Sequence, residues 1–189
     1  MRYFLGFLIA IGLIVLIFIL ILKAFSGSSN SGSAPLPKPL INYANTTTTM
    51  QMTIDGQINA DQDHQSLQIT VGANVTQINI FQGYQGTAVN TKNYANNQAA
   101  YAVFLRALDL QNYTKGNPDP SKTDSRGYCP SGIRYTFKII SGDNKTTENY
   151  WSTTCGGLGT FQDNFNVVHE LFTRQVPNYD QVVQGISLS

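Results

Sequence analysis

The sequence predicts an α+β domain, with one antiparallel sheet packed by two helices, behind an N-terminal transmembrane helix. Three observations predict it: an apolar/polar alternation of period two before residue 82 and again after residue 132, a period of three to four between residues 93 and 112, and an apolar run at the start. The strands group together rather than alternating with helices. The expected order is β-β-β-α-β-β-α.

The apolar run at residues 3–22 predicts a signal-anchor helix, with residues 1–25 as the membrane segment. Sixteen of its twenty residues are Leu, Ile, Phe or Val. In a helix they would span about 30 Å and favour the bilayer by about 5 to 10 kcal/mol. A cleaved secretory signal is the alternative, because Ala24 and Ser26 are small residues before Gly27. The length of the run favours retention, since cleavable apolar regions are usually shorter.

Residues 26–40 form the predicted linker, which reads SGSSNSGS and then APLPKPL. Gly/Ser-rich chain is flexible, whereas alternating prolines favour the stiffer polyproline II conformation. Arg2 and Lys23 flank the apolar run almost symmetrically, so charge alone does not orient it. The spacer, the two cysteines and the low charge favour a single-pass protein of the cell membrane, with a short cytoplasmic N-terminus and the C-terminal domain outside.

Residues 41–189 have the length of one compact domain. Of the chain's 12 basic residues, 10 follow Lys23, against 11 acidic ones, so this part carries a net charge of −1. It contains no basic run, and nucleic-acid binding therefore has no electrostatic support.

The first strands are predicted at residues 50–58, 67–71 and 75–81, as an antiparallel meander. Their apolar positions alternate with Gln, Asn and Thr. Such side chains solvate a sheet, and they can also hydrogen-bond a sugar or a protein partner. The sheet face is therefore one candidate binding surface.

The helical pattern at residues 93–112 predicts an amphipathic helix that docks on this sheet. Its apolar stripe includes Tyr94, Ala95, Tyr101, Leu105 and Leu108. Tyr101 is a candidate binding residue, because a tyrosine stripe can line a pocket, but the same stripe can equally be core.

A polar loop at residues 114–126 contains two more candidate binding residues, Asp119 and Asp124. Carboxylates can bind calcium, but an EF-hand loop needs oxygen ligands at alternate positions, a central Gly and a terminal Glu. The loop lacks that spacing, so no metal and no cofactor is predicted.

The next stretch predicts a hairpin whose base is closed by a disulfide between Cys129 and Cys155. Residues 133–139 alternate, and the returning strand follows a turn at SGDN. If Ile140 faces Asn144, the same register places the cysteines opposite each other and Trp151 opposite Ile133. Three aromatic residues of the hairpin are candidate binding residues: Tyr135, Tyr150 and Trp151.

A last helix is expected after the glycines at residues 156–159, capped by Thr160 or Asp163 and ended by Pro177. Residues 179–188 are expected to pack back on the domain. His169 and Glu170 begin a zincin-like HExxH, but Thr173 stands where the second ligand would be. Two Cys and two distant His also fit no compact zinc site.

No catalytic constellation stands out, and the expected function is a membrane-anchored extracytoplasmic binding or interaction domain, not an enzyme. Its partner would be an envelope protein or polymer. One alternative is a cell-envelope hydrolase, using His64 or His169 with nearby carboxylates such as Asp61 and Asp63. Another is a structural subunit of an envelope assembly.

Overall fold

A computed structural model describes residues 39–117, 119–156 and 159–188, which belong to the compact unit Lys38–Ser189. The predicted membrane segment and nearly all of the predicted linker lie outside the described residues. Among the residues that are described, no helix is both long and apolar enough to cross a membrane.

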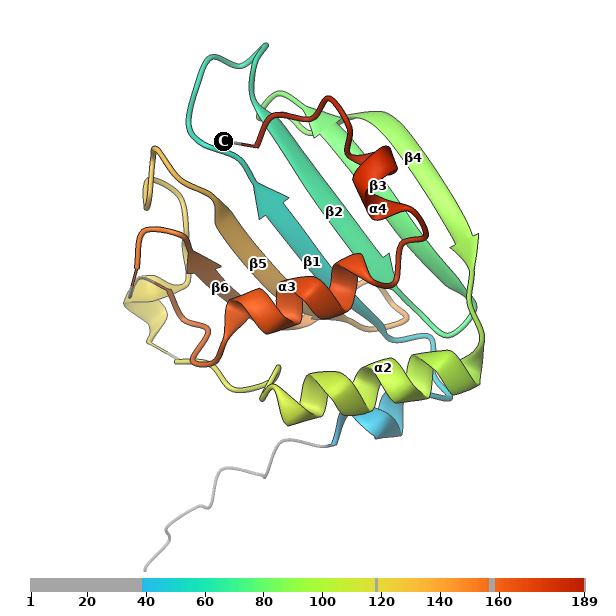
Figure 1. The fold of residues 1–189 in the computed structure, drawn as a ribbon. Coiled ribbons are helices and arrows are strands. Elements are labelled where there is room, and N and C mark those ends of the chain that lie inside the picture. Colours follow the sequence, from blue (N-terminus) through green and yellow to red (C-terminus); the bar gives the residue numbers. More distant parts are fainter. Residues whose placement is uncertain (1–38, 118, 157–158, 189) are drawn as a thin grey trace, which may run out of the picture. The chain divides into compact units, whose positions relative to one another are not determined.

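The described residues form a six-stranded antiparallel sheet with the spatial order β4-β3-β2-β1-β5-β6 (Figure 1). The strands are β1 (Thr49–Asp55), β2 (Gln65–Val71), β3 (Val75–Gln82), β4 (Thr87–Ala95), β5 (Arg134–Ile140) and β6 (Thr146–Thr153). The central strand β1 pairs with β2 on one side and with β5 on the other. The β1–β5 pairing is long-range, and it joins the β5–β6 hairpin to the meander formed by β1 to β4.

The helical elements of the described residues are α2 (Gln98–Leu110), α3 (Phe165–Thr173) and α4 (Tyr179–Val182), with 3₁₀ turns at Leu40–Tyr43 and Pro120–Lys122. The three α-helices lie on one face of the sheet (Figure 1). This architecture confirms the α+β class and the antiparallel sheet.

The core lies between that face and the helices. Alternate residues of the central strands, such as Met50, Met52 and Ile54 of β1, are at most 2 % exposed. They meet Leu105 of α2 and Phe172 of α3, which are completely buried. Because successive side chains of a strand point to opposite faces, this alternation also fixes which residues lie on the other face.

The predicted order of elements was wrong in two respects, because a fourth strand, β4, precedes the first helix and a short further helix, α4, follows α3. All of its residues are exposed except Tyr94, which is half-buried. A strand with two exposed faces has no apolar alternation, so the pattern used to find the other strands is missing there. Tyr94 and Ala95 end this strand. The helix begins only at Gln98. Asn97 is its N-cap, and the side chain of Asn97 accepts from the Ala100 amide at 3.0 Å.

The predicted register of the second hairpin was also wrong. Trp151 pairs with Thr136 instead of Ile133, and Arg134 pairs with Thr153. The connecting loop is longer than assumed, because Ser141 and Lys145 close it, and a register shift follows at Ile139/Ile140. Trp151 therefore lies on the face away from the helices.

The predicted disulfide is present despite the register error, with Cys129 and Cys155 joined at 2.01 Å. Both cysteines lie beyond the ends of β5 and β6. Cys129 occupies a turn with a positive φ of 52°. The bond therefore ties the incoming loop to the end of the hairpin.

The C-terminal part contains the predicted helix and the predicted packing of the tail, but α3 ends at Thr173, before Pro177, and its N-terminal cap differs. Asn164, and neither Thr160 nor Asp163, caps α3, accepting from the Asn166 amide at 3.1 Å. The tail packs back on the core through half-buried apolar residues, which include Tyr179, Ile186 and Leu188.

Candidate functional site

The sheet face opposite the helices presents uncharged hydrogen-bonding side chains. We call this surface the polar face. On β1 to β4 it consists of Gln51, Thr53, Gln68, Thr70, Gln77, Asn79, Thr91 and Asn93. All of them are exposed or half-buried. On β1 to β3 they alternate with buried residues along the strand, whereas the residues of β4 are exposed on both faces except for Tyr94.

Side-chain hydrogen bonds run across the polar face from strand to strand. They join Gln51 Nε2 to Thr70 Oγ1 at 3.2 Å, Gln68 Nε2 to Thr53 Oγ1 at 3.4 Å, Gln77 Nε2 to Asn93 Oδ1 at 2.9 Å and Thr91 Oγ1 to Asn79 Oδ1 at 2.8 Å. A side-chain amide has two donors and a carbonyl with two lone pairs. Each amide therefore keeps hydrogen-bonding capacity for a ligand while its neighbours hold its orientation.

The long loop between α2 and β5 covers part of the same sheet face at β6. Trp151 Nε1 donates to the Lys122 carbonyl at 2.6 Å, and the Tyr128 ring lies 5.1 Å from the indole. Trp151 is only 3 % exposed. This predicted binding residue is thus placed beneath a loop, and the polar face on β1 to β4 lies beside it.

The loop's two acidic candidates are engaged within the loop itself. Asp119 accepts from the Ser121 hydroxyl at 2.7 Å and from the Ser121 amide at 2.9 Å, and these bonds lower the pKa of its carboxyl. Asp124 is paired with Arg126, whose bonds lower the pKa of the Asp124 carboxyl to about 2. Both carboxylates shape the loop.

The tyrosine candidates belong to the helix side of the sheet. Tyr101 is completely buried, and its hydroxyl donates to the Thr48 carbonyl at 2.8 Å. Tyr135 is 8 % exposed. Tyr150 is half-buried, and its hydroxyl donates to Glu148 at 2.6 Å. Burial, reinforced by Glu148, raises the pKa of Tyr150. The structure does not bring these side chains together with the polar face.

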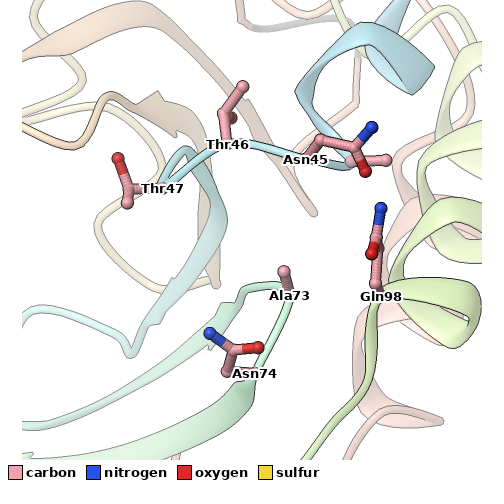
Figure 2. A pocket seen from close by; sticks show the side chains of 7 residues that line it. Asn45, Thr46, Thr47, Ala73, Asn74 and Gln98 are labelled. Atoms are coloured by element: carbon pink, nitrogen blue, oxygen red, sulfur yellow. The ribbon is translucent and has the colours of Figure 1, made fainter.

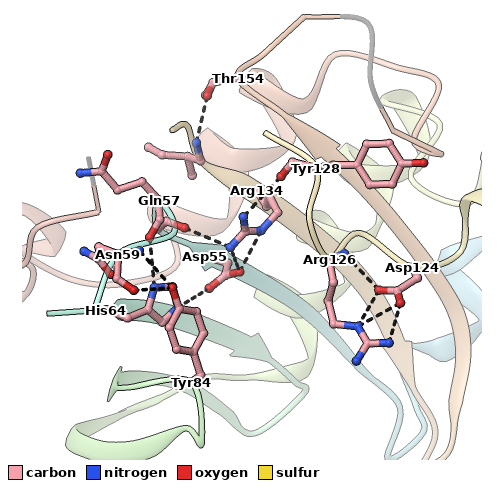
Figure 3. Close-up of polar contacts among 12 residues, drawn as sticks. Asp55, Gln57, Asn59, His64, Tyr84, Asp124, Arg126, Tyr128, Arg134 and Thr154 are labelled. Carbon is pink, nitrogen blue, oxygen red and sulfur yellow. Dashed lines mark hydrogen bonds and ion pairs between the residues drawn. The ribbon is translucent and has the colours of Figure 1, made fainter. Parts of the chain in front are cut away.

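An ionic cluster ends the polar face, where Asp55 closes β1 and Arg134 opens β5 (Figure 3). Arg134 Nε donates to Asp55 Oδ2 at 2.9 Å, and a second, shorter contact joins Nη2 to the same oxygen. His64 Nε2 lies 2.9 Å from Asp55 Oδ1. The side chains of His64 and Arg134 are only 3 % and 5 % exposed, whereas that of Asp55 is 32 % exposed.

Tyr84 covers one face of the His64 ring. The two rings are stacked, with their centroids 4.0 Å apart and an angle of 12° between their planes (Figure 3). The Tyr84 hydroxyl donates to the Asn59 carbonyl at 2.9 Å and accepts from the Asn59 amide at 3.0 Å. Gly83 turns the chain toward this position with a φ of 74°, which a glycine adopts without strain. The ring is thus fixed at its hydroxyl, at its stacked face and at the turn.

The structure shows where the residues of the hydrolase hypothesis lie. His64 has a carboxylate partner, but it is Asp55; Asp61 instead accepts from the Tyr84 amide at 2.8 Å. The other ring nitrogen, Nδ1, lies 3.2 Å from the Gln57 carbonyl. Both nitrogens therefore face oxygens of the chain. His169 lies on the helix side, where its ring meets the Tyr135 ring edge-on at 5.5 Å.

A cleft of about 250 Å³ opens beside the cluster, and we call it the end cleft. Three loops supply its walls: the β1–β2 loop, the β3–β4 turn and the loop before β5. The lining residues are Asp55, Ile58, Tyr84, Ser125, Arg126, Gly127 and Arg134. No local pattern in the sequence indicates this site, because Asp55 and Arg134 meet only through the β1–β5 pairing.

A second hollow lies near the start of β1, between the turn before that strand, the β2–β3 turn and α2 (Figure 2). Its volume is about 470 Å³, and its walls are Ala44, Asn45, Thr46, Thr47, Ala73, Asn74 and Gln98. None of these lining residues is titratable. Within the described ranges, no group of three or more His, Cys, Asp or Glu side chains is arranged to hold a metal ion.

Comparison with known protein families and with curated proteins finds no match for this sequence. The function is therefore inferred from the geometry of the polar face and the end cleft.

Proposed function

We propose that this protein is a membrane-anchored extracytoplasmic binding domain that holds an envelope protein or polymer against its polar face. One observation carries the proposal: an ordered array of uncharged amide and hydroxyl side chains covers β1 to β4 opposite the helices. Binding through such an array relies on many direct and water-mediated hydrogen bonds. It needs no chemical step.

The arrangement of His64 supports binding rather than catalysis. A histidine that acts as a general base needs one ring nitrogen within hydrogen-bond reach of the substrate proton that it removes. Here Nε2 faces Asp55, Nδ1 faces the Gln57 carbonyl, and the Tyr84 ring lies on the imidazole face. We assign the cluster a structural role, holding the loops of the end cleft to β1 and β5.

The extracytoplasmic location is supported by the disulfide between Cys129 and Cys155, because disulfides persist in oxidising compartments. The apolar run at residues 3–22 and the linker after it add a predicted anchor and spacer. Together they would hold the domain off the outer surface of the membrane.

The function is tested by Gln68→Arg, which places a bulky cation in the middle of the polar face. Val103→Arg is the matched control, because Val103 is 66 % exposed on α2, on the helix side of the sheet. We expect the full-length Gln68→Arg protein to lose retention on isolated envelope polymer, or crosslinking to its protein partner in native membranes. The Val103→Arg protein should behave as wild type. Equal retention and crosslinking in both variants would remove the polar face from the proposal.

A structural subunit is the second candidate, and the position of β4 favours it. This strand ends the sheet within the described part of the chain, and its backbone edge can pair with another strand. Crosslinks from Thr91 of β4 only to other copies of the protein would support a self-assembling subunit. Crosslinks to other envelope components would support the binding domain.

A further inference from the structure

We propose that the end cleft binds one neutral sugar ring of a saccharide chain, stacked on the outer face of Tyr84. The inference rests on the proposed function, since it names the class of polymer and the subsite that anchors it. The geometry places this subsite at the end of the polar face, because Asp55 follows Gln51 and Thr53 along the same side of β1.

The aromatic ring of Tyr84 is held in a fixed position. Tyr84 is 50 % exposed although its inner face is stacked on His64 and both hydrogen-bonding capacities of its hydroxyl are used by Asn59. The exposed half is therefore mainly ring carbon held in one orientation. A rigid aromatic surface binds the C–H face of a sugar with little loss of conformational entropy.

The charges at the end cleft are balanced. Asp55 is paired with Arg134, and Arg126 with Asp124. These pairs cancel, and each cation already has a carboxylate. A charged ligand would have to compete with these bonds, whereas a neutral polyhydroxyl ligand adds to them.

Two charged side chains of the end cleft, Asp55 and Arg126, keep hydrogen-bonding capacity for a ligand. An ionised carboxylate has about four lone-pair positions. Asp55 uses three of them, one for His64 and two for Arg134. The fourth can accept from a sugar hydroxyl, because the Asp55 side chain is 32 % exposed. Arg126, whose side chain is 89 % exposed, bonds Asp124 only through Nε and Nη2, so Nη1 can donate to a neighbouring hydroxyl.

Size and polarity agree with a single ring. The end cleft has a volume of about 250 Å³, below the 300–1,000 Å³ usual for drug-sized ligands. Ile58 contributes an apolar wall, being 46 % exposed. The cleft thus combines two apolar surfaces with a few polar groups at its base, and the remaining rings of the chain would follow the polar face.

The test is a titration followed by ¹³C NMR of isoleucine δ1 methyl groups in the full-length protein in detergent micelles. The probes are cellotetraose, maltotetraose and tetra-N-acetylchitotetraose, with tetragalacturonate as an acidic comparison. We expect at least one neutral tetrasaccharide to shift the Ile58 methyl signal, while buried methyls such as those of Ile69 and Ile78 stay in place. A shift caused only by tetragalacturonate, or no shift of Ile58 by any probe, would overturn the proposal.

Variants connect the shift to the stacked ring. Tyr84→Ala should weaken binding at least tenfold, because it removes the aromatic anchor. Tyr84→Phe keeps the ring but loses its bonds to Asn59, so its affinity should lie between those of Tyr84→Ala and wild type. Because Tyr84→Ala also uncovers His64, the positions of the Ile69 and Ile78 methyl signals serve as the check on folding. Arg126→Ala, at an exposed side chain, should weaken binding severalfold with no change of fold. Unchanged affinity in a folded Tyr84→Ala protein would refute stacking.

This outcome is separable from that of the proposed function. If no saccharide binds but Gln68→Arg still abolishes capture of a protein partner, the sugar subsite falls and the binding domain stands. If Gln68→Arg also has no effect, both fall.

Discussion

Replacing Asp55 by alanine should destabilise the domain by about 3–5 kcal/mol, the cost of leaving a buried charge without its partner. Arg134 is buried, with its side chain 5 % exposed, and Asp55 accepts from both its Nε and its Nη2. After the substitution the guanidinium keeps only the Gly56 carbonyl at 3.1 Å and the Tyr128 carbonyl at 3.4 Å. His64 loses the same carboxylate.

The assay is urea unfolding of the full-length protein in detergent, followed by the fluorescence of its one tryptophan, Trp151. Thr53→Ala is the matched control, two residues earlier on the same strand and face, where one hydrogen bond of 3.4 Å to Gln68 is lost. It should cost no more than about 1 kcal/mol. Adding Arg134→Met to Asp55→Ala should recover more than half of the loss, because the unpaired charge is then gone. A cost below about 1 kcal/mol for Asp55→Ala would refute this account of the cluster.

The remaining predictions concern the stability that the disulfide contributes, the accessibility of its cysteines in cells, and the pH dependence of stability at His169. Replacing Cys129 and Cys155 together by serine should lower the free energy of unfolding by about 3.5 kcal/mol, a value set by the 26-residue sequence separation of the two cysteines, and the same urea assay measures it. In intact cells a membrane-impermeant maleimide should label these thiols only after reduction; labelling that needs lysis but no reductant would contradict an extracytoplasmic domain. Burial lowers the pKa of His169 below 6.5 despite the opposing effect of Glu170. The unfolded chain therefore takes up the proton first, so this contribution to stability is complete above pH 6.5 and is lost as the pH falls toward the folded-state pKa. Between pH 7.5 and pH 5 the melting temperature of wild type should fall more than that of His169→Gln, and parallel curves would contradict a lowered pKa for the half-buried His169.

The strands that bury one face could be predicted from the sequence. In β1 and β2 the alternation of apolar residues is regular, and the structure keeps it. In β3 only Ile78 and Ile80 follow it, because Thr76 occupies the next buried position and Val75 is 43 % exposed. Strand β4 could not be predicted from the sequence, because it buries neither face and its residues therefore show no apolar alternation. Local periodicity reports burial more directly than it reports strand geometry.

The candidate site shows the same division. The polar face follows from the alternation once the buried face is known. The ionic cluster does not, because Asp55 and Arg134 are 79 residues apart and meet through the pairing of β1 with β5. The disulfide was predicted correctly through a wrong register, since two cysteines near the ends of one hairpin can meet in more than one register.

Strand β4, at one end of the described sheet, should open locally more easily than the central strands. Its residues are exposed except for the half-buried Tyr94, and its pairing with β3 is interrupted at Ile80/Phe81. Opening of this strand would therefore break backbone hydrogen bonds without wetting the core, and it requires far less free energy than global unfolding. Its amides should exchange with solvent deuterium ahead of those of β1. Thr91 and Asn93 would leave with it, so the polar face has a stable inner part on β1 to β3 and an outer margin whose width fluctuates.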